Sequence, residues 1–349
     1  TKKLIKALGL IIVVALLAAV LPMQAKAATI CVNPGGTGGC YSSIQTAINA
    51  ANAGDTINVA PGEYEENVIV NKAITLQGAG SEYTTIVATD GNATPLIFNA
   101  NGATVRGFHL THNYTQDELD DWNFKNNGVA FYQPGNTLSD CKVTKNRNGI
   151  YINNAQGNII RDNTIENNRT GLNLTNTVNG TKIEKNTIQN NWTLGLVYYQ
   201  LDFPTNFDTV TVEGNSFNNN WYSEILIKDT SDSTGTLDVT GNTFSDDPVT
   251  YTTSADIKWN EPGFADLKPE EFGGTATMPT TPLPTLRIYN VPGVTLQYDH
   301  KTLMVGVNQP YTTIQSAIAD ASDGDTINVA AGTYTQEGAL VVSTPNLTI

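Results

Sequence analysis

The chain has few basic residues, few cysteines and few histidines. Of its 349 residues, 19 are lysine or arginine and 33 are aspartate or glutamate, so the formal net charge is −14. Nucleic acid and anionic membrane surfaces require a basic footprint, and this balance argues against both as partners. Three histidines are too few to argue a Ser-His-Asp arrangement. The acidic balance suits solubility outside the cell and is compatible with weak Ca2+ binding, but it defines no certain cofactor.

Long apolar runs are absent except near the N-terminus. Lysines precede an apolar run over residues 8–21, and a small-x-small segment follows at residues 25–27. These features are typical of a secretory signal peptide, so we predict cleavage after Ala27 and no membrane span in the mature chain. A permanent N-terminal anchor is the alternative, because the run is long for a signal core. The sequence starts without methionine and stops within a motif, so we expect a fragment of a longer protein.

Two of the three cysteines lie at the ends of one glycine-rich loop. Cys31 and Cys40 enclose four glycines, and in an oxidising compartment we predict a disulfide between them, worth about 2–3 kcal/mol. Two thiols at this spacing without a nearby histidine do not make a zinc site, and we predict no metal site. Cys141 lies within a repeat, where we expect it to pack as a small apolar side chain and not to act as a nucleophile.

The longest internal similarity is a motif that occurs twice. Residues 41–64, YSSIQTAINAANAGDTINVAPGEY, recur as residues 311–334, YTTIQSAIADASDGDTINVAAGTY. Apolar residues at positions 44, 47, 48 and 51 have the spacing of an amphipathic helix, which Ser42 or Ser43 can cap and Gly54 can end. Strands are expected next, at residues 56–59, 67–70 and 73–76. The motif predicts a helix that covers the open end of a stack of strands.

Between the two copies runs a shorter repeat. Its units begin at Asn163, Asn186, Asn215 and Asn242, and Cys141 and Phe108 take the same place in earlier coils. A second polar position follows five residues later, at Asn113, Asn146, Asn168, Asn191 and Asn220. One coil is too small to bury its own apolar face, so we expect the coils to stack about 4.8 Å apart. Equivalent asparagines then form hydrogen-bonded ladders.

The helix-to-strand opening and the Asn-Thr-Ile repeats resemble the right-handed parallel β-helix proteins of the pectin-lyase-like superfamily. Secreted bacterial β-helix repeat proteins and the nitrous-oxide-reductase maturation group are the most similar members. The resemblance covers residues 29–250 and again 311–349. It implies an all-β fold, a right-handed parallel β-helix (solenoid) with an N-terminal capping helix, followed by the start of a second β-helix. It also implies an extracytoplasmic protein that binds, cleaves or modifies polysaccharide, or a surface module.

The same features predict four segments. Residues 1–27 form the signal peptide and residues 28–250 the first β-helix. Residues 251–310 are an irregular linker or closing module, because the repeat breaks near Thr250 and proline becomes frequent. Residues 311–349 hold the cap and first strands of a second, truncated β-helix domain.

An insertion after the Phe108 unit is the first candidate for chemistry. It carries Asp117, Glu118, Asp120 and Asp121, and His109 lies one strand position away. Two carboxylates can act as acid and base on a glycosidic bond, or bind Ca2+ that neutralises a uronate. A short solvated loop is the alternative. The catalytic motifs of polygalacturonase-like, pectin-methylesterase-like and pectate-lyase-like enzymes are absent from the chain, which puts these three activities in doubt.

A column of large side chains follows the second asparagine position. Arg147, Arg169, Trp192 and Trp221 occupy equivalent places in successive coils, and Tyr132, Tyr151 and Tyr199 are expected to point outward on the adjoining strands. Indoles stack on sugar rings and arginines pair with uronate carboxylates, so this column predicts a glycan-binding groove. A self-stacking Arg–Trp ridge that stabilises the turn is the alternative.

Three functions are compatible with these features. The first is a secreted or cell-surface module that binds extracellular polysaccharide. The second is a carbohydrate-active enzyme, a lyase, hydrolase or epimerase, that uses the acidic insertion. The third is a structural surface or adhesion protein. Loss of the indoles at Trp192 and Trp221 affects binding in the first two, whereas the insertion matters only to the enzyme.

Overall fold

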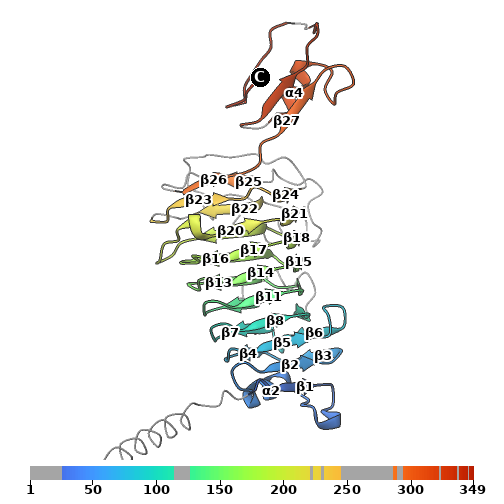
Figure 1. The fold of residues 1–349 in the computed structure, drawn as a ribbon, viewed down its shortest axis with the longest axis vertical. Helices are drawn as coiled ribbons and strands as arrows, with labels where there is room; N and C mark the ends of the chain where they lie inside the picture. Colours follow the sequence, from blue (N-terminus) through green and yellow to red (C-terminus); the bar gives the residue numbers. More distant parts are fainter. Residues whose placement is uncertain are drawn as a thin grey trace, which may run out of the picture.

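The computed structural model describes residues 26–113, 126–220, 223–228, 232–244, 286–288, 294–321, 324–335, 338–344 and 346–349. Three parallel sheets of eight strands each, here named sheets A, B and C, stack coil upon coil along one axis (Figure 1). Because each coil contributes one strand to each sheet, the chain winds as a parallel β-helix. The fold predicted from the sequence is thereby confirmed.

The strands of each sheet come from successive coils. Sheet A contains β1 (Thr29–Val32), β2 (Thr56–Val59), β5 (Thr75–Gly78), β8 (Thr104–Arg106), β11 (Thr137–Ser139), β14 (Ile159–Arg161), β17 (Lys182–Glu184) and β20 (Thr211–Glu213). Sheet B contains β3 (Gly62–Glu65), β6 (Thr84–Val87), β9 (His109–Thr111), β12 (Lys142–Thr144), β15 (Thr164–Glu166), β18 (Thr187–Gln189), β21 (Ser216–Asn218) and β24 (Thr243–Phe244). Sheet C contains β4 (Val68–Val70), β7 (Leu96–Phe98), β10 (Asn127–Phe131), β13 (Asn148–Asn153), β16 (Thr170–Thr175), β19 (Leu194–Tyr199), β22 (Ser223–Lys228) and β25 (Leu286–Ile288).

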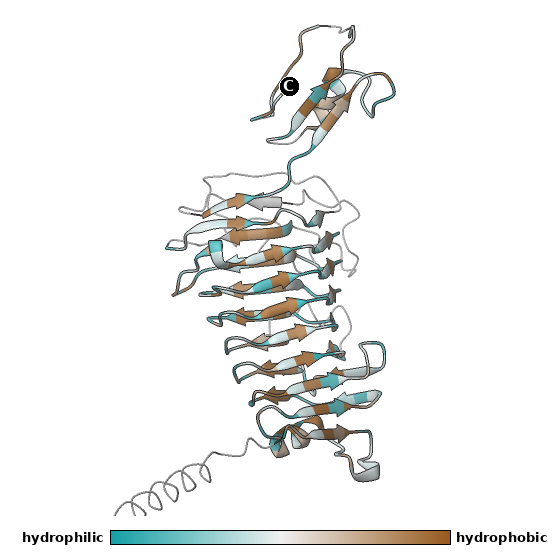
Figure 2. Cartoon of the chain, in the orientation of Figure 1, coloured by the Kyte–Doolittle hydropathy of each residue, from teal (hydrophilic) through white to brown (hydrophobic). Residues whose placement is uncertain are grey.

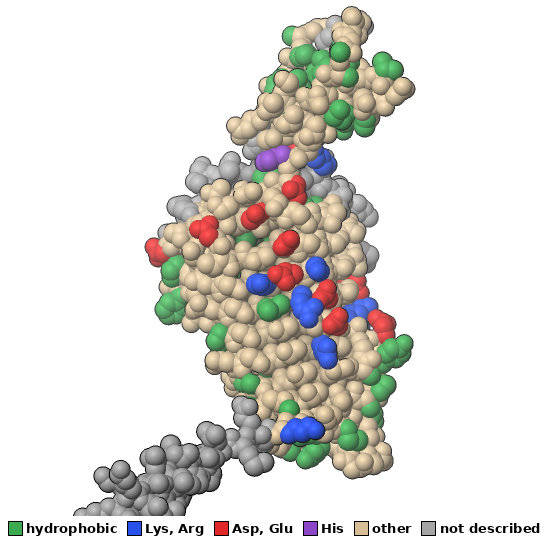
Figure 3. All heavy atoms as spheres, viewed as in Figure 1, with side chains coloured by type: hydrophobic (Ala, Val, Ile, Leu, Met, Phe, Trp, Pro, Cys, Tyr) green, Lys and Arg blue, Asp and Glu red, His purple; other side chains and the backbone are tan. Residues whose placement is uncertain are grey.

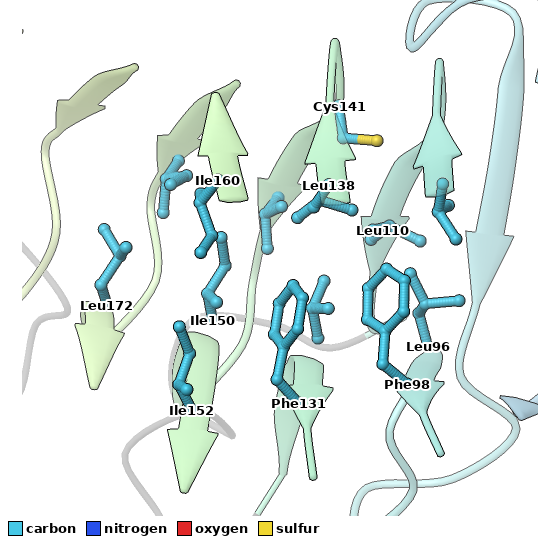
Figure 4. Close-up of a cluster of buried hydrophobic side chains, with 14 of the residues drawn as sticks. Leu96, Phe98, Leu110, Phe131, Leu138, Cys141, Ile150, Ile152, Ile160 and Leu172 are labelled. Carbon is cyan, nitrogen blue, oxygen red and sulfur yellow. The ribbon is translucent and has the colours of Figure 1, made fainter. Parts of the chain in front are cut away.

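Alternation along these strands creates one continuous core. Hydrophobic residues recur on the strands of every coil (Figure 2), and those that face inward stack on their equivalents above and below. Phe98 and Phe131 are stacked with ring centroids 4.4 Å apart (Figure 4). The Cys141 side chain is buried in the same core, as predicted.

Short turns between sheets A, B and C depend on left-handed residues. A non-glycine residue with φ between 53° and 58° precedes most rungs of the two columns, at Asp140, Asp162, Lys185, Lys145, Asn167, Asn190 and Asn219. Glycines with φ of 67° and 71°, Gly214 and Gly241, precede the last two rungs of the first column. The next residue then turns its side chain into the stack. Asn163 donates from its backbone N–H and from Nδ2 to Oδ1 of Asn186, both at 3.0 Å. Asn168 does the same to Asn191, at 3.1 Å. Both predicted ladders are present.

A column of glycines makes room for the second ladder. An ideal Cβ on Gly171 would lie 2.5 Å from the backbone oxygen of Gly195 and 3.0 Å from Nδ2 of Asn191. The same conflict recurs at Gly128, Gly149 and Gly195. The last position in this column is Glu224, whose buried carboxylate accepts hydrogen bonds from the backbone N–H and Nδ2 of Asn220. It takes the place of the amide oxygen that the other rungs receive from the next asparagine.

The other end of the second ladder differs from the prediction. Asn113 was expected to be a rung, but its side chain is exposed. His112 is buried instead, with Nδ1 at 2.7 Å from Oδ1 of Asn146 and Nε2 at 2.8 Å from the oxygen of Ala93. The imidazole of His112 bridges the ladder and the loop after β6. It occupies the place in the ladder that the repeat pattern assigned to Asn113.

The predicted capping helix is α2 (Ile44–Ala50), which begins at the N-cap Ser43. Its N-terminus is also held by Glu66, which accepts hydrogen bonds from the N–H groups of Ile44 and Gln45. The sequence analysis expected Gly54 to end this helix, and that prediction is wrong. The helix ends at Ala50, and Nζ of Lys72 donates to the carbonyls of the last turn at 2.6–3.0 Å. A cation serves here in place of a glycine cap.

The second motif repeats the construction of the first. Strand β27 (Thr302–Val305) pairs with β28 (Thr326–Val329) beside α4 (Ile314–Asp320), around a hydrophobic cluster of its own. Gln315 bonds the backbone of Val341 through both amide atoms, as Gln45 bonds Ile69. Strands β25 and β26 (Val294–Gln297) pair with β22 and with β23 (Gly235–Asp238), so strands after residue 250 still join the first stack. The exact segment borders stay predictions.

Cys31 and Cys40 form the predicted disulfide. It closes the loop between β1 and the residues before α2, next to the cap. We expect replacement of both by serine to lower the free energy of unfolding by about 2–3 kcal/mol, because the unfolded loop regains entropy. Urea unfolding of the variant and of the oxidised parent measures the difference. Equal midpoints would contradict the expectation.

Candidate functional site

The outer face of sheet C differs from the rest of the protein in charge. Within the described strands of sheet C the only acidic residue is Glu224, and its side chain is buried in the ladder. Charged side chains gather instead on the face that carries β14, β17 and β20 of sheet A (Figures 1 and 3). In a chain with a net charge of −14, a face without exposed described carboxylates is suited to a neutral or anionic ligand.

The outer face of sheet C is only partly open. Register places Ala130, Tyr151, Asn173, Val197 and Leu226 in one outward column. Ala130, Val197 and Leu226 are at most 3 % exposed, whereas Tyr151 and Asn173 are half-buried. Among these five positions, the accessible ones therefore lie at β13 and β16, between covered positions on either side.

Three tyrosines surround this accessible part. Tyr132, 43 % exposed, makes an edge contact with Tyr151, with ring centroids 6.4 Å apart. Tyr199 ends β19 in register with Thr175. Burial raises the pKa of the Tyr151 phenol, and the neighbouring Tyr199 and Tyr132 raise it further. The ring contact and the strand register place these three residues on one part of sheet C, and we name them the tyrosine cluster.

Amide and hydroxyl groups connect the tyrosine cluster to the strands. Nδ2 of Asn173 donates to Oδ1 of Asn148 at 3.2 Å, and the Thr175 hydroxyl donates to Oδ1 of Asn173 at 3.2 Å. Thr175 and Asn153 lower the pKa of the Tyr151 phenol and so oppose the effect of burial. Sequence analysis did not single out these amides, although Asn at outward positions of β13 and β16 was visible in the alternation.

The predicted Arg–Trp column is aligned as the repeat implied, but it is more buried than expected. The N–H of Arg169 bonds the oxygen of Asn146, and the N–H of Trp192 bonds the oxygen of Asn168, so Arg147, Arg169 and Trp192 are equivalent. Arg169 is 7 % exposed, whereas Arg147 and Trp192 are half-buried. Burial lowers the pKa of the Arg147 guanidinium, and Tyr199, which lies within electrostatic reach, raises it. Trp221 lies outside the described residues.

The predicted catalytic group is not assembled within the described residues. Asp117, Glu118, Asp120 and Asp121 lie outside them. His109 faces outward on sheet B, where Nε2 lies 2.8 Å from the Thr144 hydroxyl. Burial lowers the pKa of His109, and nearby Lys142 lowers it further. Lys142 pairs with Glu166 at 3.0 Å. His109 thus belongs to a polar network on sheet B, and its role in catalysis stays a prediction.

The three sheets define a right-handed parallel β-helix protein of the pectin-lyase-like type. A family model for NosD, described as a periplasmic copper-binding protein, matches residues 48–268, and the chain belongs to this family. A comparison with curated protein sequences gave no match.

Solved structures with a similar fold include several proteins whose names describe enzymes that act on polysaccharides. The catalytic unit of a GH87 α-1,3-glucanase from Streptomyces thermodiastaticus is 17 % identical, with 82 % of this chain and 51 % of that chain covered and a TM-score of 0.47. The pectate lyase Pel9A is 11 % identical, with 86 % of each chain covered and a TM-score of 0.46. The A-module of the mannuronan C-5 epimerase AlgE6 from Azotobacter vinelandii is 15 % identical, with 87 % of this chain and 93 % of that chain covered and a TM-score of 0.35. None of these likenesses bears on activity.

The described residues do not fit the copper in the family description. Among them, no group of three or more His, Cys, Asp or Glu side chains could hold a metal ion. Cys31 and Cys40 are oxidised, and burial raises the pKa of the Cys141 thiol to about 12. Both ring nitrogens of His112 already face hydrogen-bond partners. We therefore derive no copper chemistry for these residues. Nor do the described residues contain a helix long and apolar enough to cross a membrane.

Proposed function

We propose that this chain is an exported module that binds polysaccharide on the outer face of sheet C, around the tyrosine cluster and Arg147. The observation that carries the proposal is the grouping of three partly accessible tyrosines with amide side chains on a face that lacks exposed described carboxylates. Aromatic faces stack on sugar rings, and amides satisfy ring hydroxyls, so this combination matches the surface of a glycan.

Charge favours a glycan that carries carboxylates. The Arg147 guanidinium attracts uronates, whereas the acidic residues on sheet A would repel them. Export is supported by the predicted signal peptide, by the disulfide and by the periplasmic location in the family description.

Binding of the oxidised protein to polygalacturonate, alginate and a neutral glucan tests the proposal. We expect Tyr151→Ala to weaken binding by about 10- to 100-fold, because it removes the central aromatic contact. Tyr83, which is 66 % exposed away from sheet C, provides the matched control, and Tyr83→Ala should bind as the parent does. Thermal unfolding checks that both variants are folded.

Two results would count against the proposal. One is an absence of binding to all three polymers, and the other is equal loss in the Tyr151 and Tyr83 variants. The sizes of the polymers after incubation are measured by mass spectrometry in the same samples. Intact polymers agree with a binding module, whereas fragments would favour the enzyme hypothesis and direct mutagenesis to Asp117 and Asp121.

A further inference from the structure

The loop between β19 and the short helix η2 (Phe207–Thr209) presents apolar side chains to solvent. Leu201 is 64 % exposed and Phe203 is 52 % exposed, and the adjoining Pro204 is exposed as well. Single exposed apolar residues are ordinary, but two large ones separated by one residue form a patch. The exposed Asp202 lies between them.

The backbone of this loop is fixed by the coil before it. Oδ1 of the buried Asn176 accepts hydrogen bonds from three successive N–H groups, those of Leu201, Asp202 and Phe203, at 2.9, 2.8 and 3.4 Å. The Thr177 hydroxyl donates to the oxygen of Pro204 at 2.7 Å. Because the loop is held on both sides, its apolar side chains are displayed without a large entropy cost on binding.

The loop stands next to the site proposed above. It begins directly after Tyr199, and its anchor Asn176 donates from Nδ2 to Oδ1 of Asn153 at 3.0 Å. Asn153 is two residues after Tyr151 on β13. The amides of Asn176 and Asn153 therefore connect the loop to the strand that carries the central tyrosine. The loop lies just beyond the ends of β13, β16 and β19.

We propose that Leu201 and Phe203 form an apolar wall of this site and receive methyl-ester or acetyl groups carried by the glycan. The inference rests on the proposed function and deepens it. Ester methyl groups gain from contact with apolar side chains. A free uronate at the same place would meet the carboxylate of Asp202, whereas an ester is neutral and escapes that repulsion. The wall thus selects an esterified sugar unit that neighbours the sugar units bound by the tyrosine cluster.

Two samples of polygalacturonate of equal length, one partly methyl-esterified and one fully de-esterified, test the wall. We expect the parent to bind the esterified polymer about tenfold more tightly, the size of effect that contact with two exposed apolar side chains can give. The double variant Leu201→Ser, Phe203→Ser should lose this preference and keep the parental affinity for the de-esterified polymer. In a separate variant, Asp202→Asn should bind the de-esterified polymer more tightly than the parent.

The outcomes separate the two proposals. If the parent binds both polymers equally, or if the serine variant retains the preference, the wall is wrong while the site around Tyr151 stands. If Tyr151→Ala binds as the parent does, the proposed function fails, and the wall fails with it. Both serine substitutions are at exposed positions, so thermal unfolding is expected to match that of the parent.

Discussion

Replacement of Asn168 by alanine is expected to destabilise the β-helix by about 3–5 kcal/mol, since buried polar groups that lose their partners cost more than the bond itself contributes. Oδ1 of Asn168 accepts from the N–H and from Nδ2 of Asn146, at 3.2 and 2.9 Å. Its own Nδ2 donates to the oxygen of Val143 at 2.9 Å and to Asn191 at 3.1 Å. All of these groups are buried, and alanine satisfies none of them.

Urea unfolding followed by circular dichroism measures this loss. Asn101 is exposed, and Asn101→Ala serves as the control, with an expected change within about 0.5 kcal/mol. A loss below about 1 kcal/mol for Asn168→Ala would contradict the view that the ladder stabilises the stack, because it would fall within the range of ordinary substitutions.

Substitution of Gly171 by alanine is expected to cost about 3 kcal/mol, because overpacking against fixed backbone is poorly relieved. The added Cβ would lie 2.5 Å from the oxygen of Gly195 and 3.2 Å from Cγ2 of Ile188. Neither neighbour can move without disturbing the next coil. The strain arises from proximity between coils and not from the backbone angles of Gly171 itself.

Gly332 offers a matched control in the second motif. An alanine Cβ there would lie 3.6 Å from the nearest atoms, which belong to Tyr334, so Gly332→Ala should leave the unfolding of its own motif unchanged. Equal stability of the Gly171 variant and the parent would show that the coils are farther apart than the structure describes. The measurement is again denaturant unfolding, followed for each variant separately.

Much of the fold was predictable from the sequence because the repeat consists of residue types that have few structural roles. Asparagine tolerates the left-handed and bridging angles of tight turns, and its amide bonds equivalent asparagines above and below. Positions such as Asn163 and Asn186 therefore identified the ladders. The glycine at the second position of β10, β13, β16 and β19 was visible too. The reason for it, the asparagine ladder that passes behind, became clear only from the stacked coils.

The errors occurred where a side chain from another segment took over a local role. The pattern placed a rung at Asn113, but the larger imidazole of His112 reaches both Asn146 and Ala93 and is buried instead. The pattern also assigned the end of α2 to Gly54, but Lys72, distant in the sequence, binds the last carbonyls. Contacts of this kind depend on the register between coils, which periodicity alone does not give.

The candidate site was predictable in its parts and not in its arrangement. The repeat aligned Arg147, Arg169 and Trp192, but it did not show that Arg169 is buried or that Tyr199 lies within electrostatic reach of Arg147. The cluster of Tyr132, Tyr151 and Tyr199 depends on which residues face outward at each coil and on which neighbours cover them. Outward alternation predicted the direction of each tyrosine, whereas accessibility required the whole stack.

Hydrogen–deuterium exchange with and without polygalacturonate tests the central claim, that glycan binds on the outer face of sheet C. Bound polymer should slow exchange in β13, β16 and β19 and in the loop at residues 200–205, and leave the strands of sheets A and B unchanged. Protection centred on sheet A or sheet B, or no protection at saturating polymer, would contradict the claim.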